Sequence, residues 1–355
     1  PARRGAHFAR RLIDQTRLPL TQVAFASGFR SVRQFNELLK ATFGAAPREL
    51  RRAARGPAPE TAGLELRLPA RPPYDPAVVL AFLAPRATPG LEQADGLLYR
   101  RLVRLPDGPA RVEIEAGERG LALRVSRASG SGLMALVAGA RRLFDLDADG
   151  PAVHAHLRRD PALAAHLPRP AALRLPGTLS PWELVVKAVL GQQVSVAAAR
   201  TFAARLVERL GEPVAGHEPL VRLFPEPATV AESDLDGLGL TKARAATLRA
   251  LARAVADGHV RLEPGAPSDE TRAALCAIPG IGPWTAAYVA LRALGDPDAF
   301  PAADLGLRRA LAEGGALPPP AEVERRAEAW RPWRGYAVFA LWNSLAGAPA
   351  RPRKG

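Results

Sequence analysis

The stretch LCAIPGIGPWTAAYVALRALGDPDAFPAADLGLRRAL, residues 275–311, constrains the fold of this chain more than any other. Pro279 ends one predicted helix and Pro283 opens a second, because proline fits the first turn of a helix but not its interior. Gly280 and Gly282, between the prolines, allow backbone conformations that side chains forbid. The sequence therefore predicts two helices joined by a tight PGIG turn, which we call the hairpin turn.

The hairpin turn predicts a binding site for the phosphate backbone of a nucleic acid. Its N–H groups and the N-terminus of the second helix can converge on one phosphate oxygen, which gives binding independent of base sequence. We therefore expect Gly280, Ile281, Gly282 and Thr285 to contact DNA. Beyond the second helix, Asp304 directly precedes the predicted helix LGLRRAL. Its carboxylate can serve as that helix's N-cap or as a catalytic group.

These residues resemble those of the helix-hairpin-helix superfamily of DNA glycosylases, and within it the AlkA type, 3-methyladenine DNA glycosylase II. The resemblance rests on L-x-x-I-P-G-I-G-x-W-T-A followed by Asp304, and on LRLPGTLSPWELVVKAVLGQQVSV; it extends more weakly over residues 63–149. It implies a hydrolase that flips alkylated purines (3-methyladenine, 7-methylguanine type) out of duplex DNA and excises them, leaving an abasic site for base excision repair. The alternative is a sequence-specific regulator of the alkylation response with an inactive glycosylase fold.

A catalytic role for Asp304 follows from the chemistry that the resemblance implies. Positive charge develops on the sugar as the bond to the base breaks, and a carboxylate beside it stabilises that charge and orients the attacking water. Relatives that also cut the DNA strand carry a lysine two residues after the second hairpin glycine, where this chain has Trp284. Tryptophan cannot form an imine, so we expect no strand cleavage.

Three aromatic residues are candidates for a pocket that holds the damaged base. Trp284 and Tyr288 lie four apart and share a helix face, and the resemblance places Trp342 in the same cleft. Aromatic faces attract cationic rings such as alkylated bases. Packing in an ordinary hydrophobic core is the alternative for all three.

The loop GQQVS interrupts an otherwise apolar helical pattern with Gln192 and Gln193. These side chains can simply satisfy backbone groups at the helix junction. The resemblance instead places Gln193 in the minor groove, near the gap left by the everted base. Lys242, at the start of a later helix, is a further candidate contact to DNA. The segment at 235–255 predicts a pair of helices.

The chain has a single cysteine, Cys276, which excludes an internal disulfide and an all-cysteine zinc or iron–sulfur site within this sequence. No cofactor is required by the expected chemistry. The resemblance allows one Na⁺ or K⁺ ion at the hairpin turn, bound by the backbone carbonyls of Cys276, Ile278 and Ile281.

Residues 1–55 predict a helix-turn-helix unit. Ser31 and Gln34 form a capping-box pattern at the start of its second helix. The A-x-x-x-G-F turn followed by phenylalanine resembles the second helix-turn-helix motif of AraC-type regulators. Such regulators normally use two motifs, and this sequence contains only one complete motif. That resemblance places Arg30, Arg33 and Gln34 on the face that reads base edges. A vestigial module whose arginines contact only phosphates is the alternative.

The remaining boundaries follow from changes in periodicity. Residues 56–63 are a Pro/Ala-rich linker. Residues 64–147 alternate apolar and charged side chains in four segments and add two helices, which predicts an antiparallel sheet that supports the site without chemistry of its own. Residues 148–355 are helical. The fold class is therefore multidomain and mainly α with an α+β middle domain: AraC-type helix-turn-helix, antiparallel sheet with helices, and all-α helix-hairpin-helix glycosylase domain.

The net charge of +14 over 355 residues favours a polyanionic partner, and double-stranded DNA is the expected one. No uninterrupted apolar run or signal peptide is present, so no membrane partner is expected. We expect a monomer in the bacterial cytoplasm. The sequence begins without methionine, and the resemblance to fusions of a regulator with a glycosylase predicts that it is a fragment of a longer protein.

Overall fold

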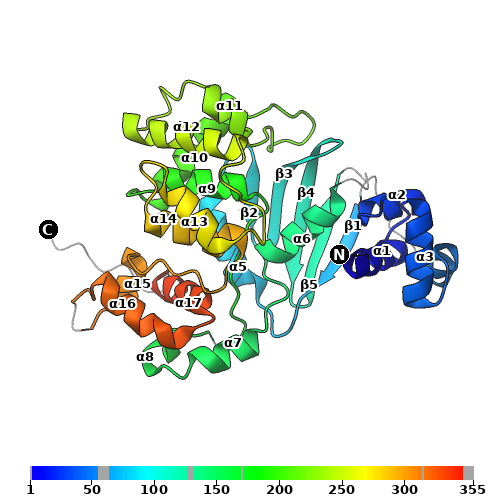
Figure 1. Ribbon diagram of the computed structural model, residues 1–355, viewed down its shortest axis with the longest axis horizontal. Helices are drawn as coiled ribbons and strands as arrows, with labels where there is room; N and C mark the ends of the chain where they lie inside the picture. Colours follow the sequence, from blue (N-terminus) through cyan, green and yellow to red (C-terminus); the bar gives the residue numbers. More distant parts are fainter. Residues whose placement is uncertain (1, 55–63, 127–131, 169–170, 314–315, 347–355) are drawn as a thin grey trace.

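The computed structural model describes residues 2–54, 64–126, 132–168, 171–313 and 316–346. An N-terminal helical unit is followed by a five-stranded sheet and then by a large helical part (Figure 1). This order confirms the predicted fold class. Within the described residues, no helix combines the length and the apolar character needed to cross a membrane.

The N-terminal unit is the predicted helix-turn-helix. Ser31 accepts a hydrogen bond from the backbone N–H of Gln34 at 3.2 Å and so caps the second helix of the motif. The predicted capping box is only half formed, because the Gln34 side chain accepts from the N–H of Arg30 and not from that of Ser31. The helices of this unit are α1 (Ala2–Gln15), α2 (Leu20–Ala26), α3 (Val32–Phe43) and α4 (Pro47–Ala53).

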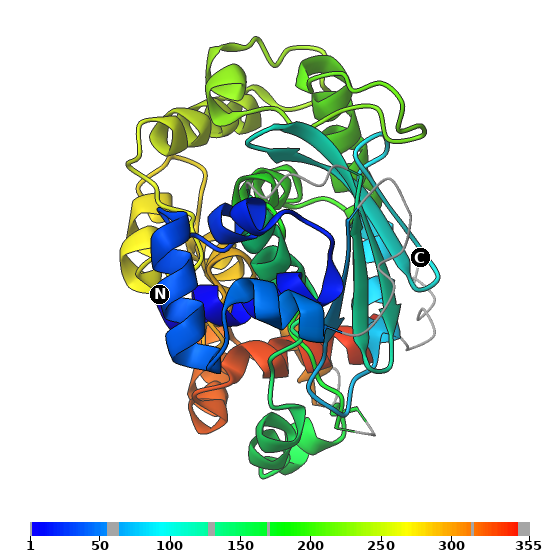
Figure 2. The same cartoon turned by 90° about the vertical axis from the view of Figure 1, so that its right-hand side faces the viewer.

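This unit packs against the sheet on the side away from the large helical part (Figures 1 and 2). Gln15 at the end of α1 accepts a hydrogen bond from the backbone N–H of Arg67 in the first strand, at 2.9 Å. The apolar residues of the unit and of the sheet belong to one continuous core. The helix-turn-helix is therefore held on the body of the chain by packing. The predicted linker, residues 56–63, lies outside the described residues.

The sheet is antiparallel with strand order β1-β5-β4-β3-β2. Alternating burial along the strands agrees with the predicted period of two. The predicted turn separates β4 from β5, whereas β2 was not apparent from periodicity. Helix α5, extended by a 3₁₀ turn, and α6 accompany the sheet. The bounds are β1 (Leu64–Pro69), α5 (Pro76–Leu83), the 3₁₀ turn (Ala84–Arg86), β2 (Glu92–Asp95), β3 (Leu98–Leu105), β4 (Gly108–Gly117), β5 (Gly120–Val125) and α6 (Leu133–Leu143).

The large helical part begins after α6. The prediction of a helical pair at 235–255 is wrong in its first half: Gly237 and Gly239 adopt φ of 80° and 78°, which break a helix, and only α12 forms. The helices are α7 (Gly150–Leu157), α8 (Pro161–Ala164), α9 (Pro181–Leu190), α10 (Val196–Leu210), α11 (Pro227–Glu232), α12 (Lys242–Ala256), α13 (Ser268–Cys276), α14 (Pro283–Val289) with a π-helical extension (Ala290–Leu294), α15 (Leu305–Ala310), α16 (Pro320–Ala327) with a 3₁₀ turn (Glu328–Trp330), and α17 (Arg334–Ala346).

Two hydrophobic cores meet around one cavity. The first runs from the helix-turn-helix through the sheet to α17, and the second lies among α9, α10, α12 and α14. Phe82 of the first core and Leu184 of the second both line a cavity of about 590 Å³. The fold therefore brings the sheet and both halves of the helical part to a single site.

Candidate active site

Asp304 caps a helix and also lines the cavity. It is the N-cap of α15, and its Oδ1 accepts a hydrogen bond from the N–H of Leu307 at 2.9 Å. The indole Nε1 of Trp284 donates to Oδ2 at 2.8 Å, and that of Trp342 donates to Oδ1 at 3.0 Å. Both carboxylate oxygens are thus held while the group lines the cavity. The helix cap fixes the position, and the two indoles fix the orientation.

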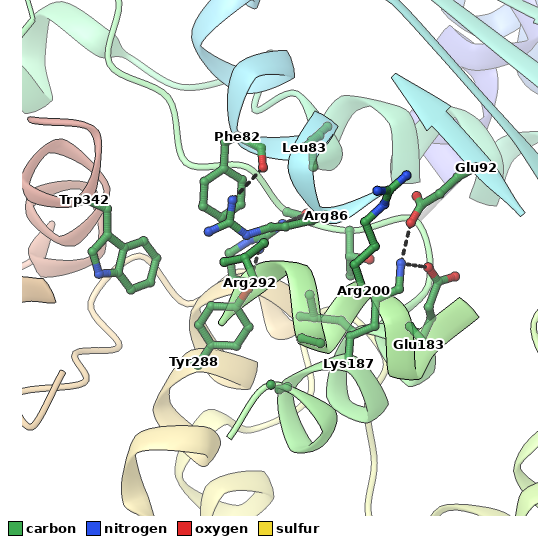
Figure 3. Close-up of a pocket in the computed structure, with 18 of the residues that line it drawn as sticks. Phe82, Leu83, Arg86, Glu92, Glu183, Lys187, Arg200, Tyr288, Arg292 and Trp342 are labelled. Carbon is green, nitrogen blue, oxygen red and sulfur yellow. Dashed lines mark hydrogen bonds and ion pairs between the residues drawn. The ribbon is translucent and has the colours of Figure 1, made fainter. Parts of the chain in front are cut away.

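Four aromatic rings line the same cavity as this carboxylate and extend the predicted set of three. Trp284 stacks on Tyr288, with centroids 5.5 Å apart and planes 12° apart. Tyr288 lies 6.0 Å from Trp342, and Trp342 is nearly parallel to Phe82 at 6.4 Å and 8°. All four line the cavity, where Figure 3 labels Phe82, Tyr288 and Trp342. Phe82 comes from α5, so the part at 64–147 contributes a ring to the cavity wall that the sequence did not single out.

The hairpin turn is built as the sequence predicts, with one correction. Gly280 has φ 89°, and a Cβ there would overlap the side chain of Thr247 on α12. Gly282 has φ −98°, which any residue can adopt, and a Cβ there would meet only open space. Glycine is therefore required by the backbone only at Gly280. The freedom at Gly282 is room for another molecule to approach.

The amide groups of the turn are not equivalent. The N–H of Ile281 donates to the carbonyl of Ile278 at 3.0 Å, so it closes the turn and is not free for phosphate. Within the described part of the chain, the N–H groups of Gly280 and Gly282 have no protein acceptor. Thr285 is only 2 % exposed, and its hydroxyl accepts from Gln192 at 3.0 Å, so its side chain faces inward. Within the turn itself, the available phosphate donors are therefore the two glycine amides, and Thr285 can contribute only through its backbone N–H.

The two glutamines between α9 and α10 have different surroundings. Gln192 donates to the carbonyl of Gly280 at 2.9 Å as well as to Thr285, which ties this loop to the hairpin turn. Gln193 is exposed and has φ 56°, a left-handed conformation that is uncommon for residues with a side chain. No side-chain partner of Gln193 is found among the residues that the structure describes. The strained backbone holds a free side chain outside the protein surface.

Comparisons with known proteins agree with this geometry. Residues 2–53 match a helix-turn-helix domain family, residues 65–180 the AlkA N-terminal domain, and residues 186–334 the HhH-GPD superfamily of base excision DNA repair proteins. A probable bifunctional transcriptional activator/DNA repair enzyme AlkA of Mycobacterium tuberculosis is 41% identical over 342 residues, which are 95% of this chain and 69% of that protein. The chain belongs to the AlkA family. DNA-3-methyladenine glycosylase 2 of Escherichia coli is 32% identical over 284 residues, 79% of this chain and 97% of that one.

The architecture has solved counterparts. The 3-methyladenine DNA glycosylase from Archaeoglobus fulgidus superposes with a TM-score of 0.67 at 21% identity, over 80% of this chain and 98% of that one. At this identity the likeness establishes the fold alone. The AlkA fold and the helix-hairpin-helix glycosylase architecture are therefore common to this chain and that protein.

A network of buried charges forms the far wall of the cavity in this AlkA family member. Lys187 of α9 contacts Glu92 of β2 and lies 2.6 Å from Glu183, which in turn lies 2.6 Å from Arg101 of β3 (Figure 3). Tyr99 donates to Glu92. Burial raises the pKa of Glu92, but Lys187 and Arg101 outweigh burial and lower this pKa to about 2.

Sequence reasoning missed this network because its members lie far apart in the chain. One signal was available: Lys187 is one of four lysines and stands four residues after Glu183 in an otherwise apolar helix. Burial lowers the pKa of Lys187, but Glu183 and Glu92 outweigh burial and raise it. The ammonium group therefore stays charged between two carboxylates.

The remaining candidates lie outside the cavity. Arg30, Arg33 and Gln34 of the helix-turn-helix are exposed, and Arg33 forms an ion pair with Glu37 at 2.9 Å. Lys242 is exposed at the start of α12. Nowhere in the described ranges do three His, Cys, Asp or Glu side chains gather as metal ligands.

Proposed function

We propose that this chain is a monofunctional DNA glycosylase that flips alkylated purines out of duplex DNA and hydrolyses their glycosidic bonds. The observation that carries the proposal is the Asp304 carboxylate, held by Trp284 and Trp342 inside an aromatic cavity. An everted base is the form in which C1′ becomes accessible. The aromatic rings are suited to an electron-poor cationic base, worth roughly 1 kcal/mol or more per desolvated contact.

Asp304 would act where positive charge develops on the sugar. As the C1′–N bond breaks, its electron pair leaves with the base, which becomes neutral. Water adds to C1′ and releases a proton, which the carboxylate can accept. The two indole N–H groups hold both carboxylate oxygens, so little reorganisation is needed when the charge appears.

An amine nucleophile is disfavoured by two observations. Trp284 occupies the hairpin position at which strand-cutting relatives have lysine. Lys187 does line the cavity, but its ammonium is bound by Glu92 and Glu183 and its pKa is raised. A charged amine cannot attack C1′. We therefore propose an abasic-site product without strand cleavage.

DNA would be held at the rim of this site. The free amides of Gly280 and Gly282 at the start of α14 are suited to a phosphate oxygen. Lys242 is an exposed positive charge on the same large helical part, and we propose it as a phosphate contact. The free side chain of Gln193, fixed by a strained backbone, supports its role in the gap left by the everted base.

An alkali ion at the hairpin turn remains part of the proposal. Cys276 is the last residue of α13, where backbone carbonyls lack helical partners, and the Ile278 carbonyl keeps a second lone pair beside the N–H of Ile281. These carbonyls with that of Ile281 fit Na⁺ or K⁺, which would strengthen the attraction for phosphate. We also propose that the chain acts as a monomer in the bacterial cytoplasm, with the chromosome.

The test is incubation of the chain with methylated duplex DNA, followed by separation of free bases and of DNA strands. We expect free 3-methyladenine to accumulate while the strands stay intact until alkali cleaves the abasic sites. Absence of free base from the native chain would contradict the proposal. Direct strand cleavage without alkali would contradict the hydrolytic mechanism.

Regulation of transcription is a second candidate function for the N-terminal unit. Residues 2–53 contain ten arginines, one lysine and three acidic residues, a net charge of +8 out of the chain's +14. Arg30, Arg33 and Gln34 are exposed on this basic unit. Sequence-specific binding is tested by competition between promoter-derived and scrambled duplexes. Equal competition would show phosphate contacts alone.

A further inference from the structure

Several arginines line the cavity, and Arg86 is one that has neither a negatively charged partner nor acceptors for most of its nitrogens. Arg86 ends the 3₁₀ turn after α5 and lines the cavity (Figure 3). Its Cζ lies 3.8 Å from the centre of the Phe82 ring, and one terminal nitrogen donates to the Phe82 carbonyl at 2.8 Å. Among the described residues, no carboxylate lies within ion-pair distance of this guanidinium. Arg86 is half-buried, and a charge with free donors inside a cavity is a candidate for binding a ligand.

The neighbouring Arg292 shows what a satisfied arginine looks like in the same cavity. Its Nε donates to the carbonyl of Pro176, and its two terminal nitrogens donate to the carbonyl of Gly177 at 2.9 Å and to the hydroxyl of Tyr288 at 2.8 Å. All three nitrogens have protein acceptors, so Arg292 holds Tyr288 in place. Arg86, in contrast, uses one nitrogen of three within the described part of the chain.

The free donors of Arg86 lie beside the rings proposed to hold the base. Phe82, under the guanidinium, is nearly parallel to Trp342, and Trp342 contacts Asp304. Arginine has donors only and remains charged. In DNA major grooves it recognises guanine, whose O6 and N7 are both acceptors, whereas adenine presents N7 beside an amino donor. A base edge with two acceptors fits this guanidinium better than an edge with one.

We propose that Arg86 is a specificity-determining residue that donates to O6 and N7 of an everted guanine alkylated at N3, in which N7 remains an acceptor. This inference rests on the glycosylase function proposed above. The inference predicts a preference among the alkylated purines. The aromatic rings accept any cationic base, whereas Arg86 favours 3-methylguanine over 3-methyladenine. These two bases carry their methyl group at the same atom and have the same charge in DNA, so repulsion from Arg86 acts on both.

The test uses duplex DNA treated with dimethyl sulfate, which contains both lesions in one substrate. Release of each base is measured in single-turnover reactions of wild type, Arg86→Met and Arg86→Lys. For Arg86→Met we expect the ratio of the 3-methylguanine to the 3-methyladenine rate to fall about ten-fold, as for the loss of one arginine–guanine contact. Arg86→Lys keeps the charge and a donor group but loses the paired donors of the guanidinium, so its ratio should lie between those of wild type and Arg86→Met.

Arg119→Met is the matched control. Arg119 is exposed in the turn between β4 and β5, so this substitution removes the same charge outside the cavity. Its ratio should equal that of wild type. An equal fall of both rates in Arg86→Met would overturn the proposal and indicate a packing or phosphate role, as would an unchanged ratio. If the wild type released neither base, the glycosylase function itself would be contradicted, and this inference with it. If the wild type released both bases but Arg86→Met left their ratio unchanged, only the role of Arg86 would be contradicted.

Discussion

Trp342 on α17 donates its indole N–H to Asp304 at the start of α15, across 3.0 Å. The matching donor, Trp284, comes from the helix that follows the hairpin turn. The rings that line the cavity are therefore also the groups that orient its carboxylate. In the function proposed above, such a site would couple recognition of the base to placement of the carboxylate, because displacement of either ring disturbs both.

Replacing Trp342 with phenylalanine separates these two roles. The ring is retained, but the hydrogen bond to Asp304 is lost, which for a charged acceptor costs roughly 1.5–3 kcal/mol. We expect single-turnover excision to slow by about ten-fold or more, with duplex binding unchanged. Trp333→Phe, outside the cavity, is the control and should keep the wild-type rate. Equal rates for the two variants would show that the indole N–H has no part in catalysis.

Borohydride trapping tests the assignment of Lys187. A covalent adduct with DNA requires a neutral amine that forms an imine with C1′. Because Glu183 and Glu92 raise the pKa of Lys187, we expect no trapped adduct at neutral pH. An adduct that disappears in Lys187→Arg would contradict the hydrolytic mechanism. Arginine is the suitable replacement, since Lys187→Met would leave two carboxylates buried with one cation and destabilise the fold by roughly 3–5 kcal/mol.

Local rules predicted the elements that carry their own signals. Proline and glycine at the hairpin turn, serine at the cap of α3, and alternating residues in β3 to β5 each specify local geometry whatever surrounds them. Asp304 was found because its spacing from the hairpin turn resembles that of a known family. The predicted contacts of the other candidate residues with DNA stay predictions.

The far wall of the cavity had no such local signal. Nothing in the local sequence distinguishes the cavity residues of the sheet part. They come together only when the sheet packs against α9; they are Phe82, Arg86, Glu92 and Arg101. Their grouping arises from long-range packing between two hydrophobic cores, which periodicity along the chain does not describe. The inward orientation of Thr285 likewise depends on Gln192 from a distant loop.

Asp145 predicts a pH dependence of stability. Burial raises its pKa from 3.8 to about 6, partly offset by hydrogen bonds from the N–H of Leu175 and from Tyr336. The folded chain binds this proton more tightly than the unfolded chain, so the contribution to stability is fully present below pH 3.8 and is lost as pH rises to about 6. We expect Asp145→Asn, which suits the φ of 50°, to remove this component.

The measurement for Asp145 is the free energy of unfolding in denaturant from pH 4 to 7. The wild type should lose stability relative to the asparagine variant across this range, with the difference levelling above pH 6. A difference that is constant with pH would contradict the assignment.

The helix-turn-helix should be separable from excision. Arg33→Ala combined with Gln34→Ala removes exposed donors on α3, a helix that lies on the side of the sheet away from the large helical part (Figure 1). We expect weaker binding to long duplexes and an unchanged excision rate on a short duplex that occupies only the hairpin side. A parallel loss of excision would show that both surfaces bind the same DNA segment.

Single-turnover excision of 3-methyladenine by Asp304→Asn tests the central claim most directly. Asparagine caps α15 as well as aspartate does, so the fold and duplex binding should be kept while the negative charge is removed. The account predicts a rate at least about 100-fold below wild type. A rate within a few-fold of wild type, in a variant that binds duplex normally, would contradict it.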